Sequence, residues 1–247
     1  MQIKIFENYE EMSVAAADAL LALLAREAAP LLGLATGSTP IAMYQELIRR
    51  RDEIENLKYV KTVNLDEYLG LPADHPQSYR YFMQEQLFKG LGLAPGQSHF
   101  PHADSLDPKE AEAAAEAYEA QLLELGPQTV QILGLGENGH IGFNEPADVF
   151  IPATHVVDLA EGTIQANSRF FASRDEVPRQ AITMGIAGIM RAREVFLLVS
   201  GEKKADALAR ALYGPISPQL PASILQLHPK LTVFCDRAAA ELLNPAQ

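Results

Sequence analysis

Short apolar segments alternate with longer amphipathic stretches along the 247 residues of this chain. Short runs rich in Val, Ile, Leu and Phe, bounded by polar or glycine-containing turns, are typical of buried strands. Such runs occur at Ile3–Phe6, Leu31–Ala35, Val60–Leu65, Val130–Leu133, Val195–Ser200 and Leu231–Cys235. Each of these segments is therefore predicted to be a strand.

Helix signals lie between the predicted strands. Asn8 and Glu11 form a start that resembles a capping box, for a helix ending near Glu27. Asp107 can cap the alanine-rich helix that Gly126 ends. Further helices are predicted over Pro40–Arg51, Ser78–Phe88 and Glu202–Leu212, and after the last strand. Helices between apolar runs, without hairpin signals, predict parallel βαβ units. We expect an α/β fold, a three-layer αβα sandwich with a mostly parallel, doubly wound sheet, in which residues 1–247 form a single domain.

The loops that follow the predicted strands are expected to share one edge of the sheet. Parallel strands place their carboxyl ends on the same edge, where open α/β sheets bind ligands. The loops that directly follow apolar runs are Thr36–Pro40, Asp66–Gln77, Gly134–Pro146 and Ser200–Lys204. The sequence therefore predicts a crevice lined by these loops.

Composition narrows the class of partner. The net charge of −12 and pI near 4.9 argue against nucleic-acid binding, which needs a basic face. A small anionic substrate is compatible, because a few local cations and backbone N–H groups suffice. The single cysteine, Cys235, excludes a disulfide framework and is expected to be buried. The polar N-terminus and the lack of a membrane-length apolar run predict a soluble, cytoplasmic protein without membrane contact.

The loop GLGENGHIGFNEP combines a histidine, His140, with a carboxylate, Glu145, and the amides Asn138 and Asn144. A histidine whose second ring nitrogen is oriented by an acid is typical of proton-transfer catalysis. The same loop matches G-x-G-x-x-G, but Pro146 and the lack of a helical period after it disfavour a dinucleotide site. We expect His140 and Glu145 to be catalytic and no cofactor to be bound.

ATGSTP, at residues 35–40, lies between a predicted strand and a predicted helix. Backbone N–H groups and the hydroxyls of Thr36, Ser38 and Thr39 could hold a phosphate there, with Gly37 allowing a tight turn. The same residues also suit a capped helix start, with Thr39 as N-cap and Pro40 at the first position. From these residues alone both interpretations stay open.

Asp66 and Glu67 follow another predicted strand. They could be a solvated pair, or one could be a general base, and residue alternation allows only one to face the crevice. The cations Arg169 and Lys204 could reach an anion, although Lys203 is equally well placed. The spacing of HFPH resembles a metal motif, but no third ligand supports it, and we predict no metal.

Taken together, these motifs resemble those of glucosamine-6-phosphate deaminases. ATGSTP, NLDEYLGL, HPQSY, GLGENGHIGFNEP, ANSRFF, SGEKKA and LQLHP occur in that family's order, from about Leu31 to Asp236. The resemblance implies an aldose–ketose isomerisation joined to deamination, which converts glucosamine 6-phosphate and water to fructose 6-phosphate and ammonia.

The resemblance also implies roles for single residues. His140 would move the proton that opens the sugar ring, oriented by Glu145 and Asn138, and Asp66 would move a proton from C2 to C1. The loop Thr36–Thr39, with Gly37 and Ser38, would bind the phosphate together with Arg169 and Lys204. The segment from about residue 159 to 182 would be a mobile lid.

Two departures from the family pattern alter these expectations. Some members carry aspartate where this chain has Asn138, and an amide supplies no negative charge. Allosteric members carry serines, an arginine and a lysine where this chain has Asp148, Val149, His155 and Val157. We therefore expect hyperbolic kinetics without an N-acetylglucosamine 6-phosphate activator, and a monomer is favoured although a homo-oligomer is possible.

Two other functions compete with the deaminase. A 6-phosphogluconolactonase shares the fold but would need no base at Asp66. A non-catalytic sugar-phosphate sensor would keep the phosphate loop, but such a regulator normally carries a DNA-binding helix-turn-helix, for which the chain offers no spare segment.

Overall fold

The main sheet is parallel, as predicted. The computed structural model describes residues 1–168, 171 and 173–243. Seven strands pair in the order β1-β10-β9-β6-β2-β3-β5, and all these pairs are parallel. The strands are β1 (Gln2–Phe6), β2 (Leu31–Leu34), β3 (Lys61–Asn64), β5 (Ser98–His99), β6 (Val130–Leu133), β9 (Val195–Val199) and β10 (Leu231–Asp236). Of these, only the two-residue β5 was not predicted.

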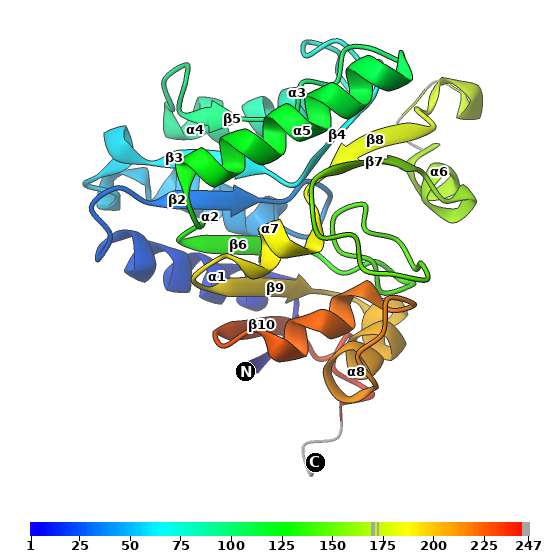
Figure 1. Ribbon diagram of the computed structural model, residues 1–247. Helices are drawn as coiled ribbons and strands as arrows, with labels where there is room; N and C mark the ends of the chain where they lie inside the picture. Colours follow the sequence, from blue (N-terminus) through cyan, green and yellow to red (C-terminus); the bar gives the residue numbers. More distant parts are fainter. Residues whose placement is uncertain (169–170, 172, 244–247) are drawn as a thin grey trace.

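Helices cover both faces of this sheet (Figure 1). One face packs on α1 (Tyr9–Leu24), α2 (Ile41–Arg49) and a continuous helical run made of α3 (Tyr79–Met83), a π-helical turn (Gln84–Phe88) and α4 (Lys89–Leu91). The other packs on α5 (Pro108–Leu125), α7 (Ile186–Met190), α8 (Ala205–Tyr213) and the 3₁₀ helix Pro221–Leu227. Side chains of β2 alternate between the faces: Leu32 contacts the α1 side and Leu31 the α5 side. The predicted three-layer sandwich is confirmed.

Helices α1 and α5 begin with side-chain caps at the predicted Asn8 and Asp107, and α3 also begins with one, at Ser78. The Asn8 side chain accepts a hydrogen bond from the Glu11 N–H at 2.9 Å, and Ser78 accepts one from the Tyr81 N–H at 3.0 Å. Asp107 accepts bonds from the first turn of α5, and Gly126 ends that helix with φ of 86°. These polar side chains satisfy N–H groups that the helices themselves leave unpaired.

Two details of the helix prediction are wrong. The Pro40 carbonyl accepts the first hydrogen bond of α2, from the Tyr44 N–H at 2.9 Å, so Pro40 and not Thr39 occupies the N-cap. After β10, residues 237–242 form turns instead of a helix. There the Asp236 carboxylate accepts the Ala239 N–H at 2.8 Å, which holds the chain in a turn.

A second, antiparallel sheet was not predicted. It consists of β4 (Asp66–Tyr68), β8 (Gln180–Thr183) and β7 (His155–Asp158) in the order β4-β8-β7. These strands are short, and the helix α6 (Glu161–Asn167) separates β7 from β8, so no hairpin signal marks them. In Figure 1 this sheet and α6 lie on the side to which the arrows of β2 and β9 point.

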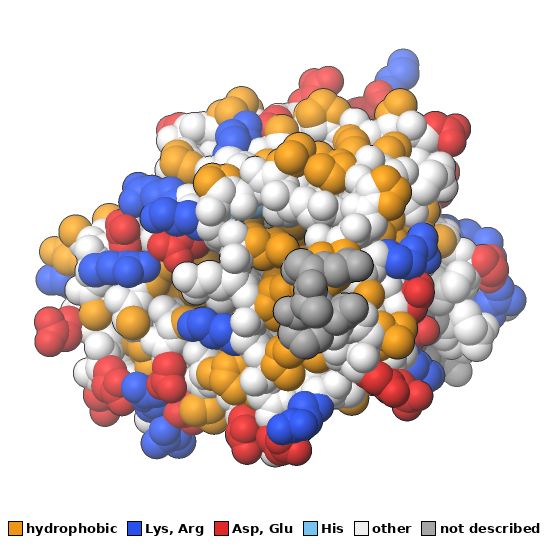
Figure 2. All heavy atoms as spheres, turned by 90° about the horizontal axis from the view of Figure 1, so that it is seen from below, with side chains coloured by type: hydrophobic (Ala, Val, Ile, Leu, Met, Phe, Trp, Pro, Cys, Tyr) orange, Lys and Arg blue, Asp and Glu red, His pale blue; other side chains and the backbone are white. Residues whose placement is uncertain are grey.

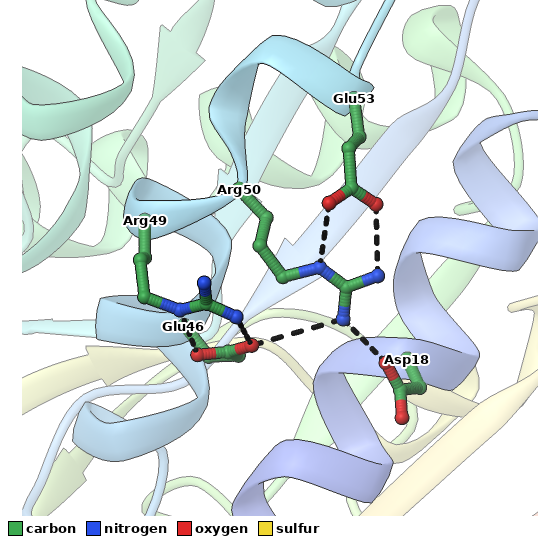
Figure 3. A network of polar contacts seen from close by, with 5 residues as sticks. All are labelled: Asp18, Glu46, Arg49, Arg50 and Glu53. Carbon is green, nitrogen blue, oxygen red and sulfur yellow. Dashed lines mark hydrogen bonds and ion pairs between the residues drawn. The ribbon is translucent and has the colours of Figure 1, made fainter.

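The surface carries charges of both signs. The face seen from below shows acidic and basic side chains distributed around apolar ones (Figure 2). Arg50 contacts Glu53, Glu46 and, from α1, Asp18, and Arg49 also pairs with Glu46 (Figure 3). This network joins α1 to α2, but such exposed pairs are screened by water and salt. None of the described helices is long and apolar enough to cross a bilayer.

Candidate active site

The topology creates a crevice between β2 and β6. The chain continues from β2 to β3 on one side, whereas β6 lies on the other side of β2. The loops that leave β2 and β6 therefore diverge at the carboxyl edge of the sheet, the place where such folds bind ligands. A cleft of about 480 Å³ opens there.

Eight of the ten predicted site residues line this cleft: Thr36, Gly37, Ser38, Thr39, Asp66, Asn138, His140 and Lys204. Glu145 hydrogen-bonds to Asn138, which itself lines the cleft. Arg169 lies outside the described residues. The sequence motifs are thus brought together around one cavity.

The loop from Thr36 to Thr39 is suited to bind an anion. Gly37 has φ of 93°, a conformation that favours glycine, and the loop leads into the N-terminus of α2. The Tyr9 hydroxyl donates to the Ser38 carbonyl and accepts the Ala42 N–H, both at 3.1 Å, which connects the loop to α1 and α2.

The structure distinguishes the two neighbouring lysines. Lys204 is partly buried and lines the cleft, whereas Lys203 is exposed. Burial lowers the pKa of Lys204, although the charge of Glu137 opposes this effect. An ammonium group at the cleft can attract the phosphate of a substrate.

Asp66 and Glu67 point to different environments, as predicted. Asp66 lines the cleft although only 5% of it is exposed, and burial, with a contribution from the Glu67 charge, raises its pKa to about 8. Glu67 instead accepts the backbone N–H groups of Tyr68, Tyr79 and Arg80 at 2.8 to 2.9 Å. Glu67 therefore holds the start of α3, so that of this pair Asp66 is the carboxylate that can act on a ligand.

The glycines of the His140 loop allow tight turns and close contacts. Gly139 and Gly142 have φ of 87° and 58°. A Cβ atom on Gly136 would lie 2.4 Å from the His140 ring. Residues 134–146 form turns and a bridge between Ile141 and Asn144 instead of starting a helix, so the glycine pattern is not that of a dinucleotide-binding turn.

Asn138 lies between His140 and Glu145. Its amide nitrogen donates to Glu145 Oε2 at 2.6 Å, and its amide oxygen lies 2.8 Å from His140 Nδ1. His140 Nδ1 is 3.4 Å from Glu145 Oε2. Because the amide nitrogen faces a carboxylate, the amide oxygen must face the ring and can only accept. Nδ1 therefore carries a proton, and in the neutral ring Nε2 is free to accept one.

Glu145 is held in its charged form. Burial alone would raise its pKa, but hydrogen bonds with His140, Thr163 and Asn138 and the charge of His140 lower it to about 2. Thr163, on α6, donates to Glu145 Oε1 at 2.5 Å. Sequence reasoning missed Thr163, since a single threonine at the start of a short helix carries no recognisable signal.

Other side chains near the cleft were also missed or have structural roles. Tyr79 and Phe143 line the cleft and stack at 5.8 Å between ring centroids. Asn144 is buried and donates to the carbonyls of Ile141 and Met184, so it holds the loop rather than a ligand.

The HFPH motif, whose residues the structure describes, shows no metal site. Its first histidine, His99, lies 3.2 Å from the Gln121 amide nitrogen. Among the described residues, no three acidic, histidine or cysteine side chains gather as metal ligands.

A second cavity of about 210 Å³ lies behind Glu145. Three of the positions at which the sequence analysis expects the chain to depart from allosteric members, Val149, His155 and Val157, line it. Burial lowers the pKa of His155, which disfavours its cationic form. These side chains offer an anion little positive charge.

Comparison with known proteins identifies the family. The family model described as glucosamine-6-phosphate isomerases/6-phosphogluconolactonase matches residues 7–234. The chain is 45% identical to the glucosamine-6-phosphate deaminase of Clostridioides difficile (strain 630), over 99% of this chain and 98% of that protein. It is 48% identical to that of Halothermothrix orenii, over 98% and 100%.

Solved structures agree with this assignment. A structure described as a monomeric glucosamine-6-phosphate deaminase superposes with a TM-score of 0.92 at 42% identity, covering 98% of this chain and all of that one. The 6-phosphogluconolactonase of Leishmania guyanensis, at 23% identity, has a TM-score of 0.79 over 98% of both chains and shares the fold. The chain belongs to the family of glucosamine-6-phosphate isomerases and 6-phosphogluconolactonases.

Proposed function

We propose that this protein is a glucosamine-6-phosphate deaminase, which converts glucosamine 6-phosphate and water to fructose 6-phosphate and ammonia. The observation that carries the proposal is the cleft that joins an anion-binding loop, a buried carboxylate and a histidine oriented by an amide and an acid. Relatives with 45% and 48% identity over nearly the whole chain bear the name of this activity.

The phosphate would bind at the start of α2. The hydroxyls of Thr36, Ser38 and Thr39 and the N–H groups near Gly37 supply donors, and Lys204 supplies a positive charge. Such contacts position the sugar without taking part in the proton transfers, so they should act mainly on substrate affinity. Arg169 is proposed as a further phosphate ligand because of its place in the ANSRFF motif.

Ring opening would use the free Nε2 of His140. This nitrogen takes the proton of the C1 hydroxyl and returns it to the ring oxygen as the C1–O5 bond breaks. The imidazolium formed in between is stabilised by Asn138 and the Glu145 carboxylate, which face Nδ1. A positioned acid–base group of this kind contributes about 10² to 10⁴ to the rate.

Asp66 would then move a proton between adjacent carbons. Its carboxylate removes the C2 proton and returns it at C1 through an enolamine, while the carbonyl oxygen O1 takes a proton from the substrate's ammonium group. Water then adds to the resulting iminium and releases ammonia. The raised pKa of Asp66 suits this task, because a weakly acidic carboxyl is a stronger base once ionised. The ammonium group of the bound substrate favours that ionised form.

The first test is ammonia release from purified protein and glucosamine 6-phosphate, with 6-phosphogluconolactone hydrolysis measured in parallel. We expect ammonia and fructose 6-phosphate in equal amounts. Lactone hydrolysis without ammonia would favour the lactonase, for which Asp66 has no task. Inactivity on both substrates together with sugar-phosphate binding would favour a sensor.

Three further features belong to this proposal. A monomer is supported by the similarity to a structure described as monomeric, and light scattering after size-exclusion chromatography tests it. The segment from about residue 159 to 182 is proposed as a lid, which hydrogen exchange with and without fructose 6-phosphate tests. A cytoplasmic location is proposed from the amino-sugar phosphate substrate and tested by fractionation.

A further inference from the structure

Thr163 links α6 to the catalytic histidine through two intermediate side chains. Its hydroxyl donates to Glu145 Oε1 at 2.5 Å, while Glu145 Oε2 accepts the Asn138 amide at 2.6 Å. The amide oxygen of Asn138 in turn lies 2.8 Å from His140 Nδ1. The two carboxylate oxygens of Glu145 are thus held by donors from different segments of the chain.

The position of Thr163 is set by packing. Thr163 is 9% exposed, and the next residue of α6, Ile164, is 5% exposed. Ile164 belongs to an apolar cluster with Tyr68 of β4 and Phe143 of the His140 loop. α6 lies within the proposed lid segment. In this structure it packs on the elements that carry Asp66 and His140, and this packing places its hydroxyl donor relative to both.

We propose that Thr163 is a positioning residue: its hydrogen bond prevents rotation of the Glu145 carboxylate and so keeps Asn138 and His140 aligned for ring opening. This inference rests on the proposed function. Without the hydroxyl, the carboxylate can turn about its last side-chain bond, a rotation with a broad energy minimum. Asn138 would then lose its partner, and its amide could present either end to the ring.

The test compares Thr163→Val, which keeps the shape, with Thr163→Ser, which keeps the hydroxyl. We expect Thr163→Val to lower kcat about 10- to 100-fold, the range for losing a hydrogen bond to a charged group, with KM within about twofold of wild type. Thr163→Ser should stay within about threefold in kcat. Thr163→Ala repeats the test should valine fail to fold.

Thr154 offers a matched control outside the cleft. It is 7% exposed and donates to the Glu119 carboxylate at 2.7 Å, so Thr154→Val removes the same kind of bond. We expect it to lower stability without changing kcat. An equal loss of kcat in Thr154→Val, or in Thr163→Ser, would overturn the proposal, as would a kcat of Thr163→Val within twofold of wild type.

A spectroscopic measurement separates this inference from the proposed function. Nitrogen-15 shifts of the His140 ring report its tautomer without any substrate. We expect the Nδ1–H tautomer in wild type and Thr163→Ser, and a mixture of tautomers in Thr163→Val. An unchanged tautomer in Thr163→Val overturns the positioning role, whereas absence of ammonia release by the wild-type protein overturns the function alone.

Discussion

The Nδ1 atom of His140 lies 2.8 Å from the amide oxygen of Asn138 and 3.4 Å from the carboxylate of Glu145. The nearer partner of the imidazole is therefore neutral, while the acid both orients that amide, at 2.6 Å, and lies within ion-pair distance of the ring. The family resemblance implied that Glu145 and Asn138 together orient His140. The geometry adds an order to them, with the amide in the middle.

Replacing Asn138 by aspartate should change turnover by less than about tenfold. The new carboxylate could still accept the Nδ1 proton of His140, but it would lose the amide donor to Glu145. The added negative charge beside the His140 ring favours the imidazolium, whereas the repulsion between the two carboxylates disfavours their alignment. The two effects on turnover should therefore largely cancel. Steady-state ammonia release at saturating substrate measures the effect. An increase of more than tenfold would show that Asn138 limits ring opening.

Replacing Asp66 by asparagine should abolish deamination while product binding is kept. An amide of the same shape cannot take the C2 proton, so we expect kcat to fall by about 10² to 10⁴. The phosphate loop, Thr36–Thr39, follows β2, whereas Asp66 begins β4. The dissociation constant of fructose 6-phosphate, measured by calorimetry, should therefore change little. Substantial remaining turnover would remove Asp66 from the role of base.

The activity should depend on pH through Asp66. Its pKa near 8 in the free protein means that the carboxylate form is a minority at pH 7. We expect kcat/KM to rise with pH and to level off above about 8, because that ratio reports the free enzyme. A profile of kcat/KM that is flat between pH 6 and 8 would contradict the assignment.

The pH dependence of folding stability should also report the ionisation of Asp66. Because the pKa of Asp66 is raised on folding from 3.8 to about 8, its contribution to stability is fully present below the lower value. It is lost as the pH rises through the higher one. Asp66→Asn should therefore match wild type near pH 4 and exceed it above pH 8, by an unfolding free energy on the order of a few kcal/mol. Denaturant titrations at both pH values test this difference.

Activation by N-acetylglucosamine 6-phosphate should be absent. Val149, His155 and Val157 line the cavity behind Glu145, where a phosphate would need cationic partners, and burial disfavours the charged form of His155. We expect hyperbolic saturation with glucosamine 6-phosphate and no change of KM on adding the acetylated sugar. Sigmoidal rates that the acetylated sugar relieves would contradict this expectation.

The main sheet and its ligand-binding edge could be predicted because each parallel strand carries a concentrated apolar run. Val130–Leu133 and Val195–Val199 are buried on both faces, which makes them readable without any partner. The antiparallel strand Gln180–Thr183 could not be predicted, because its pairing with Asp66–Tyr68 joins segments more than a hundred residues apart. Nor could Thr163 be predicted, since its role depends on that distant packing.

Gly136 leaves room for the His140 ring because it has no side chain. A Cβ atom there would lie 2.4 Å from Cε1 and Nδ1 of His140, while a cleft-lining loop of turns surrounds both residues. In Gly136→Ala the imidazole must move, which should break its alignment with Asn138. A displacement of about 1 Å can cost on the order of 10² in rate, so we expect kcat to fall by that factor. Inorganic phosphate should still bind, because the phosphate loop Thr36–Thr39 follows β2, whereas Gly136 follows β6. If kcat stayed within threefold of wild type while the protein remained folded, the ring position would not limit the reaction, and the Asn138–His140 contact would lose its catalytic meaning.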